Sequence, residues 1–167
     1  MRGAREEMRW CRGPAGVMLV GVQMFRCAAC STEVSRLVRE VPLPDPQTVR
    51  APYEVEGFED CPPHVAPGTF AYDPEPSRFW YVPAPEEGER VHVPGGPTGS
   101  VVLSPTDAVG MVPVADPGRR NGCCGPDGSD GANLACAGCG AELAIESADC
   151  WTFQEIVLDP RRVMADG

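Results

Sequence analysis

Two Cys-x-x-Cys pairs near opposite ends of the chain place the strongest limit on its fold. They are Cys27 with Cys30 and Cys136 with Cys139. In each pair the two intervening residues let one tight turn point both sulfurs at one ion, and four thiolates are a ligand set of closed tetrahedral zinc sites. The sequence therefore predicts one structural Zn²⁺ bound by all four side chains: Cys27, Cys30, Cys136 and Cys139.

The flanks of the two pairs are also alike. Residues 26–34 align without a gap on residues 135–143, and each stretch has the pattern of a strand, a turn and a returning strand. Gly140 follows the second pair, where such a turn commonly requires a positive φ, and Ser31 takes the equivalent place in the first. We predict two similar hairpins that share one ion. The alternative is two unrelated pairs, reduced or redox-active, but a thioredoxin-like role would require a βαβ context that neither pair has.

Composition indicates the fold class. The 167 residues include 19 glycines and 19 prolines, which disfavours long helices and favours short strands between turns. We predict a mainly β, loop-rich fold of small antiparallel sheets pinned by the two hairpins. The segment 42–67 is expected to be extended and irregular, and 104–108 to open one short helical turn. Strands are expected at 22–27, 37–41, 69–72, 78–82, 90–93, 100–103, 110–114, 132–135, 142–146 and 151–158.

Charge is distributed unevenly along the chain. Residues 1–23 carry four arginines and two glutamates, whereas the whole chain has a net charge of −10. We therefore expect residues 1–23 to be a disordered or mis-annotated extension, with Met24 as the natural start. Residues 24–163 are predicted to form a single zinc-stabilised domain, and residues 164–167 a C-terminal tail.

The acidic character bears on partners and location. With 24 acids, 14 arginines and no lysine, the surface should repel phosphate backbones, so a nucleic-acid partner is not expected. No apolar stretch approaches the roughly 18–20 residues that span a bilayer, and residues 1–22 make a poor export signal. We expect a cytoplasmic protein whose partner is another protein or a small molecule.

The remaining cysteines leave several interpretations open. Cys11 lies in the predicted extension. A second zinc site is one hypothesis for the others, formed by Cys61 and His64 with two of Cys123, Cys124 and Cys150. The alternatives are small buried apolar side chains for Cys124 and Cys150, surface thiols elsewhere, or a reversible disulfide between Cys124 and Cys150.

Signs of catalysis are few. A catalytic zinc keeps one position open and commonly uses histidine, whereas the best ligand set here is all thiolate and the only histidines are His64 and His92. No phosphate-binding loop, serine elbow or metalloprotease helix is present in the sequence. We predict no catalytic and no cofactor-binding residue apart from the zinc ligands. The aromatic residues at 79–81 suggest a partner-binding patch, or else ordinary packing.

Two resemblances follow from these motifs. Matched Cys-x-x-Cys hairpins around a long β region resemble the zinc-anchored β-tent architecture of Yippee-like proteins, the cereblon ligand-binding domain and zinc-bearing methionine sulfoxide reductases of the B type. Over nearly all of residues 24–163 the chain also resembles a family of small actinobacterial zinc-ribbon-like proteins. That similarity is carried by motifs at 24–30, 68–76, 121–128, 136–140 and 149–150. It implies a start at Met24 but no activity, since none is assigned to the family.

Two hypotheses for function follow. The first is a non-enzymatic binding or interaction module with one structural zinc, whose partner contacts the β face or the proline-rich segment. The second is a thiol-redox enzyme or sensor, similar to the B-type sulfoxide reductases, that uses Cys123, Cys124 or Cys150. Such a reductase would require a reactive cysteine facing an aromatic pocket near Trp80 or Trp151.

Overall fold

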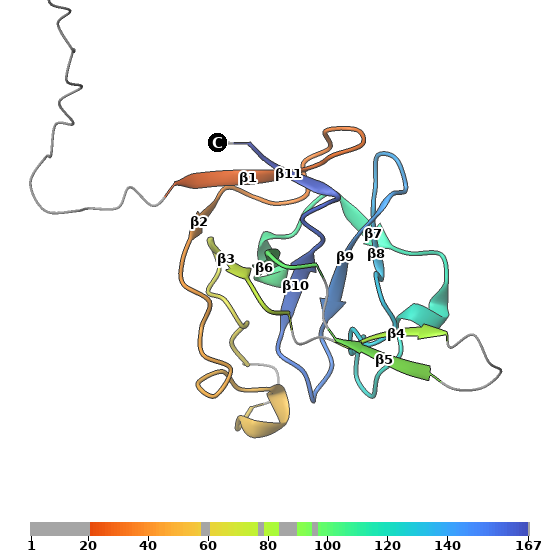
Figure 1. Cartoon of the computed structure of the whole chain (residues 1–167). Coiled ribbons are helices and arrows are strands. Elements are labelled where there is room, and N and C mark those ends of the chain that lie inside the picture. Colours follow the sequence, from red (N-terminus) through yellow and green to blue (C-terminus); the bar gives the residue numbers. More distant parts are fainter. Residues whose placement is uncertain (1–20, 58–60, 77–78, 84–89, 95–96, 167) are drawn as a thin grey trace, which may run out of the picture.

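The fold is mainly β, as the sequence predicts (Figure 1). The structure is a computed structural model that describes residues 21–57, 61–76, 79–83, 90–94 and 97–166. The strands are β1 (Val22–Cys27), β2 (Val38–Glu40), β3 (Thr69–Asp73), β4 (Phe79–Pro83), β5 (Arg90–Pro94), β6 (Ser100–Leu103), β7 (Met111–Pro113), β8 (Leu134–Cys136), β9 (Glu142–Ser147), β10 (Glu155–Leu158) and β11 (Val163–Asp166).

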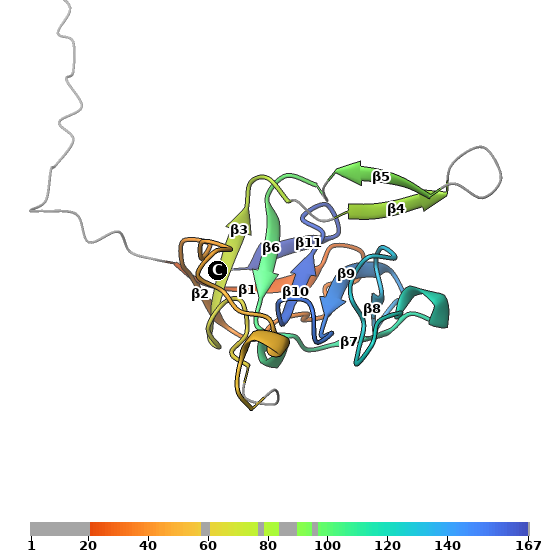
Figure 2. The same cartoon turned by 90° about the horizontal axis from the view of Figure 1, so that it is seen from below.

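Nine strands form one sheet in the order β11-β1-β2-β3-β6-β10-β9-β8-β7. Its strands pair antiparallel except for β2 and β3, which are parallel. β4 and β5 form a separate two-stranded ribbon that lies to one side of the sheet in Figure 2. The predicted mainly β, loop-rich fold is thus confirmed, with its strands arranged in one large sheet and one ribbon.

The sheet curls, so that the segment after β1 meets the segment before β7. Ser35 and Ala108 form an isolated antiparallel bridge, and the Arg36 N–H donates to the Asp107 carbonyl at 2.8 Å. The curl encloses the main core, in which Phe25 and Phe70 pack edge to face with ring centroids 5.1 Å apart. Other core side chains include Val101, Leu103, Leu134, Leu143, Ile156 and Leu158.

Strand β10 shows how alternation positions the two faces. Ile156 and Leu158 point into the core, whereas Glu155 and Val157 line a cavity on the outer face. The predicted strand over 151–158 is too long at its start, because β10 begins only at Glu155. Polar groups compete for the preceding backbone: the Thr152 N–H and the Gln154 side chain both donate to the Asp149 carbonyl. They close a turn over 149–152 instead of extending the strand.

The edge strand β11 is absent from the sequence prediction. It pairs with β1 from Met24↔Asp166 to Cys27↔Val163, so residues 164–166 extend the sheet beyond the domain end predicted at 163. At the other end β1 begins at Val22, two residues before the predicted start, while residues 1–20 lie outside the described residues.

Helical structure is limited to short turns in the described residues. The predicted turn after Ser104 is confirmed as the 3-10 helix η3 (Pro105–Asp107), and η1 (Pro52–Glu54) interrupts the proline-rich segment that was expected to be extended. A third turn, η4 (Pro117–Arg119), precedes the glycine-rich loop. Across the described part of the chain, no helix has the length and apolarity needed to cross a bilayer.

Candidate metal centre

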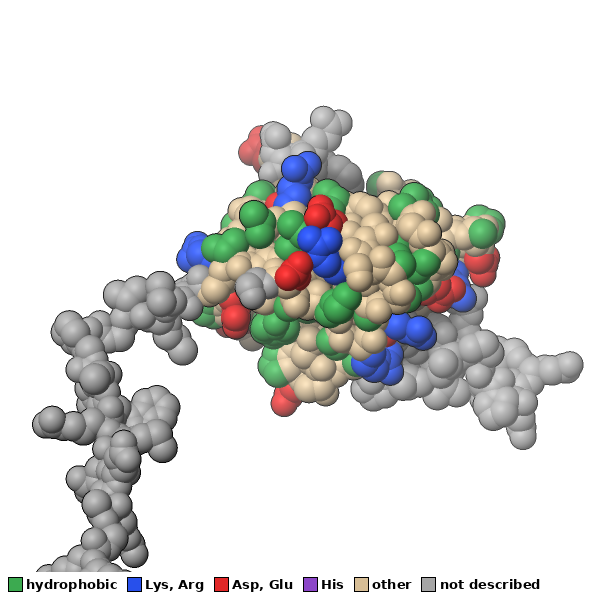
Figure 3. All heavy atoms as spheres, turned by 90° about the horizontal axis from the view of Figure 1, so that it is seen from above, with side chains coloured by type: hydrophobic (Ala, Val, Ile, Leu, Met, Phe, Trp, Pro, Cys, Tyr) green, Lys and Arg blue, Asp and Glu red, His purple; other side chains and the backbone are tan. Residues whose placement is uncertain are grey.

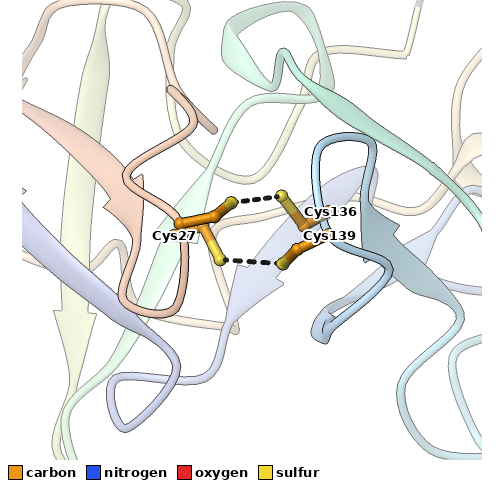
Figure 4. A group of neighbouring side chains, drawn as sticks. Cys27, Cys136 and Cys139 are labelled. Atoms are coloured by element: carbon orange, nitrogen blue, oxygen red, sulfur yellow. Dashed lines mark hydrogen bonds between the residues drawn. The ribbon is translucent and has the colours of Figure 1, made fainter.

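Four sulfurs from the two ends of the chain converge at one point. Cys27 ends β1 and Cys136 ends β8. Cys30 and Cys139 lie in the turns that follow these strands. Figure 4 shows Cys27 facing Cys136 and Cys139. The four Sγ atoms lie within 4.8 Å of one another, although the two Cys-x-x-Cys pairs are more than a hundred positions apart in the sequence. The predicted convergence of the two Cys-x-x-Cys pairs is therefore confirmed, and we refer to these residues as the four-cysteine cluster.

The spacing of the sulfurs fits a tetrahedral ion. Cys27 Sγ lies 3.7 Å from Cys139 Sγ, and Cys30 Sγ lies 3.5 Å from Cys136 Sγ. A tetrahedron with Zn–S bonds of about 2.3 Å has sulfur–sulfur edges of roughly 3.8 Å. A disulfide would need about 2.05 Å, and all four cysteines are free. The geometry is that of a cluster that could hold a metal ion.

The two hairpins are built by the same backbone hydrogen bonds. The Cys27 N–H donates to Thr32 O, and the Cys136 N–H donates to Ala141 O, both at 2.8 Å. The next bond is also equivalent, because Ser31 N–H bonds Cys27 O and Gly140 N–H bonds Cys136 O at 2.8 Å. Ser31 has a φ of 62° and Gly140 one of 77°, as the alignment predicts. Both turns thus use a left-handed residue directly after the second cysteine.

This shared conformation gives a matched pair of variants. Ser31→Gly is expected to stabilise the protein by up to about 1 kcal/mol, because glycine removes the cost of a left-handed conformation. Gly140→Ala is expected to destabilise it by about 1–2 kcal/mol, because alanine is strained in the left-handed conformation. A steric clash does not contribute, since an added Cβ meets no other atom within 4 Å. Urea denaturation of the two variants beside wild type measures both values. Shifts of the same sign would contradict the argument.

The second hairpin packs closely on the first. A Cβ at Gly138 would collide with the Thr32 hydroxyl and would lie 3.4 Å from Cys30 Sγ. The Thr32 hydroxyl in turn lies 3.2 Å from Cys30 Sγ. The position equivalent to Gly138 in the first hairpin is Ala29, which is exposed. This contact explains why the alignment changes from alanine to glycine there.

The sulfurs differ in how readily they ionise. Hydrogen bonds with the Thr32 side chain and backbone lower the pKa of Cys30 to about 6. The Ala141 N–H favours the Cys139 thiolate, but contacts with neighbouring thiols and burial outweigh it and raise its pKa to about 12. Adjacent thiolates repel one another, so four of them in one place call for a cation. Because Cys27 and Cys136 are buried while Cys30 and Cys139 are exposed, such a cation would lie at the rim of the core.

The second predicted site is only partly brought together. Cys123, Cys124 and Cys150 do converge, with their Sγ atoms within 4.8 Å of one another, and we call them the three-cysteine cluster. Cys61 and His64 do not join them. Cys61 Sγ lies 3.3 Å from the Arg50 carbonyl, and His64 Nδ1 lies 2.6 Å from Glu155 Oε2. Including Cys61 and His64 in one site with these cysteines was wrong, because the proline-rich segment places their side chains against other partners.

The buried pair of His64 and Glu155 was missed by sequence reasoning. Their side chains are 7% and 2% exposed, respectively, and the His64 ring packs 4.8 Å from that of Phe153. One signal in the sequence points to the pair: Glu155 is the lone carboxylate in an otherwise apolar strand, and a buried carboxylate requires a partner. The identity of that partner, 91 residues away, is set by the fold.

The pair lines a cavity of about 550 Å³ on the outer face of the sheet. One wall is formed by β10 and β6, through Val157 and Val102, and another by the proline-rich segment, through Leu43 and Pro46. Aromatic side chains at Trp151 and Phe153 complete the apolar part. Trp151, Phe153, Glu155 and Val157 thus share one surface, which lines this cavity.

The remaining residues named in the sequence analysis lie at the surface or outside the described structure. Trp151 is 65% exposed and its ring stacks on Tyr53 at 4.5 Å. His92 and the aromatic residues at 79–81 belong to the β4–β5 ribbon, where Tyr81 pairs with His92 in register, and their side chains lie outside the described structure. Cys11 also lies outside the described residues.

Comparison with known proteins gives no match: no family model, no curated protein and no solved structure is similar to this chain. The site therefore has to be interpreted from its own geometry.

Proposed function

We propose that this protein is a non-enzymatic binding module whose fold is held by one structural Zn²⁺ on the four-cysteine cluster. The observation that carries the metal assignment is the set of sulfur–sulfur distances, 3.5 and 3.7 Å between the two hairpins. Zinc is the ion most suited to a tetrahedral set of four thiolates. Four protein ligands leave no position for a substrate, so this ion would stabilise the fold and would not catalyse a reaction.

The outer cavity is the proposed binding site. Its volume of about 550 Å³ lies within the roughly 300–1,000 Å³ typical of small-molecule sites. It lies between the β face and the proline-rich segment, the two surfaces that the sequence analysis proposed for partner contacts. Apolar walls with a few converging polar groups are the usual composition of such sites.

Charge selects the class of ligand. Besides the His64–Glu155 pair, the lining carries the carboxylates Asp73, Glu75 and Asp127, and no arginine is among the lining residues in the described part of the chain. Aromatic faces at Trp151 and Phe153 also attract cations. We therefore propose a small organic cation with an apolar body, such as an alkylamine, as the ligand.

A matched pair of probes tests this proposal. Hexylammonium is expected to bind the zinc-loaded protein and hexanoate, of the same chain length, is not, as measured by isothermal titration calorimetry. Glu75→Gln is expected to weaken hexylammonium binding about threefold to tenfold, because the exposed Glu75 carboxylate lies at the cavity rim and such partly solvated charges contribute about 1 kcal/mol. Glu40→Gln, an exposed change on β2, serves as the control. Equal binding of the two probes would contradict the proposal.

A thiol-redox role is less well supported by the geometry. The three-cysteine cluster does bring thiols together, but none of its members lines the aromatic cavity in the described part of the structure. A sulfoxide reductase would need that arrangement. We also propose that the chain is related to the β-tent proteins, supported by the paired hairpins on a curled sheet.

The proposed partners exclude nucleic acid. Some arginines are already paired with carboxylates, as in Arg26 with Asp166 at 2.7 Å and Arg119 with Glu142 at 2.7 Å. On much of the face seen in Figure 3, acidic and basic side chains are interspersed. The many free thiols support a reducing compartment, and hence the cytoplasm, as the proposed location.

A further inference from the structure

The three-cysteine cluster joins two segments that the fold holds rigidly. Cys123 and Cys124 lie in the glycine-rich loop after η4, and Cys150 lies in the turn after β9, with all three Sγ atoms within 4.8 Å of one another. The Ala148 N–H donates to Pro126 O at 2.8 Å, and the Tyr53 N–H donates to Cys150 O at 3.1 Å. Gly125 lies so close to the Ala148 carbonyl that a side chain would collide with it.

Asp149 holds the glycine-rich loop in place through a buried hydrogen bond. It is 4% exposed, and its Oδ1 accepts the Cys124 N–H at 2.7 Å and lies 3.6 Å from Cys150 Sγ. A buried carboxylate that accepts the backbone N–H of a candidate ligand fixes the position of that ligand, as outer hydrogen bonds do in metal sites. Asp149 itself is a positioning residue, because only the three sulfurs form the candidate ligand group.

A disulfide accounts poorly for this arrangement. Neighbouring residues have Cα atoms about 3.8 Å apart, which is below the roughly 4.4–6.8 Å of ordinary disulfides. A bond between Cys123 and Cys124 is therefore disfavoured, and a bond from either one to Cys150 would leave the third thiol beside it without a role. All three thiols are free in the structure. A single ion, by contrast, would use all three.

We propose that Cys123, Cys124 and Cys150 form a second metal site, in which three thiolates bind one thiophilic divalent ion such as Zn²⁺ and the fourth position faces solvent. Cys123 and Cys124 are exposed, whereas Cys150 is buried, so the open side points outward. Binding releases one proton from each of the three thiols, and a water molecule fills the fourth position. Unlike the four-cysteine cluster, this site has room for an external donor.

Metal titration of the full-length reduced chain tests the proposal. The metal-free protein is titrated with Co²⁺, a spectroscopic substitute for zinc, and wild type is expected to bind two ions. The double variant Cys123→Ser/Cys124→Ser is expected to bind one. Both substituted positions are exposed, so its circular dichroism should match wild type. Cys61→Ser, a cysteine in neither cluster, is the matched control and should still bind two.

The open position has its own signature. Imidazole is expected to change the visible absorption of Co²⁺-loaded wild type, because it replaces the bound water. It should leave the double variant unchanged, since a closed set of four thiolates cannot accept it.

Three results would overturn the proposal: one ion bound by wild type and by the double variant alike, two ions retained by the double variant, or a disulfide between Cys124 and Cys150 in protein loaded with Zn²⁺. Failure of the four-cysteine site would look different. In that case wild type would bind one ion and the double variant none.

Discussion

Cys136→Ala is expected to unfold most of the protein at room temperature. Structural zinc in small peptides has an apparent binding free energy of about 10–16 kcal/mol, whereas a whole domain is stable by only about 5–15 kcal/mol. Cys136 is 1% exposed and belongs to the main core as well as to the four-cysteine cluster. Its loss therefore removes a ligand of the proposed ion and leaves a gap in the packing. Circular dichroism during thermal denaturation measures the effect.

The matched control is Cys61→Ala, which removes a thiol that belongs to neither cluster. We expect its melting temperature to stay within a few degrees of wild type, because Cys61 is only half-buried and lies outside the core. Adding a chelator to wild type should reproduce the loss seen in Cys136→Ala. A Cys136→Ala protein that melts cooperatively at the wild-type temperature would show that the cluster does not hold the fold.

Glu155→Ala is expected to destabilise the protein by about 3 kcal/mol, since it removes the carboxylate that bonds His64 Nδ1 in a buried site. The two side chains are 7% and 2% exposed and lie 2.6 Å apart. For a chain of this length the loss corresponds to a fall in melting temperature of roughly 10 °C. Urea denaturation in the presence of Zn²⁺ measures the free energy directly.

A double variant distinguishes the contribution of the polar contact between His64 and Glu155 from that of side-chain packing. His64→Phe with Glu155→Leu replaces both groups by apolar side chains of similar size, and such replacements are often neutral or stabilising. We expect the double variant to recover most of the stability lost in Glu155→Ala. If it is at least as unstable as the single variant, packing and not the pairing is the source of the effect.

The four-cysteine cluster could be predicted from the sequence because its signal is local and repeated. Each turn needs only its own few residues to aim two sulfurs, and the alignment of 26–34 on 135–143 placed Ser31 opposite Gly140. The structure gives both a positive φ. Strand β6, which is flanked by turn residues, was also predicted with the observed limits, Ser100–Leu103. Where local chemistry decides the structure, the sequence is sufficient.

Features set by distant contacts could not be predicted in this way. β11 has little apolar alternation, since Met164, Ala165 and Asp166 are exposed, and it is a strand because β1 offers it a free edge. His64 was assigned to a metal site by its Cys-x-x-His spacing. That spacing says nothing about Glu155, whose carboxylate meets the ring only once β10 and the segment before β3 are packed together.

The union of β1 with distant parts of the chain affects how folding proceeds. Cys27 and Cys139 are 112 positions apart, and Arg26 bonds Asp166 across 140 positions. Closing loops of this length costs entropy before any contact is gained, which slows folding. Each Cys-x-x-Cys turn, however, can capture an ion with its own two sulfurs while the remainder is still a coil. An ion bound early by one turn would keep two coordination positions available for the cysteines of the other turn when the chain ends meet.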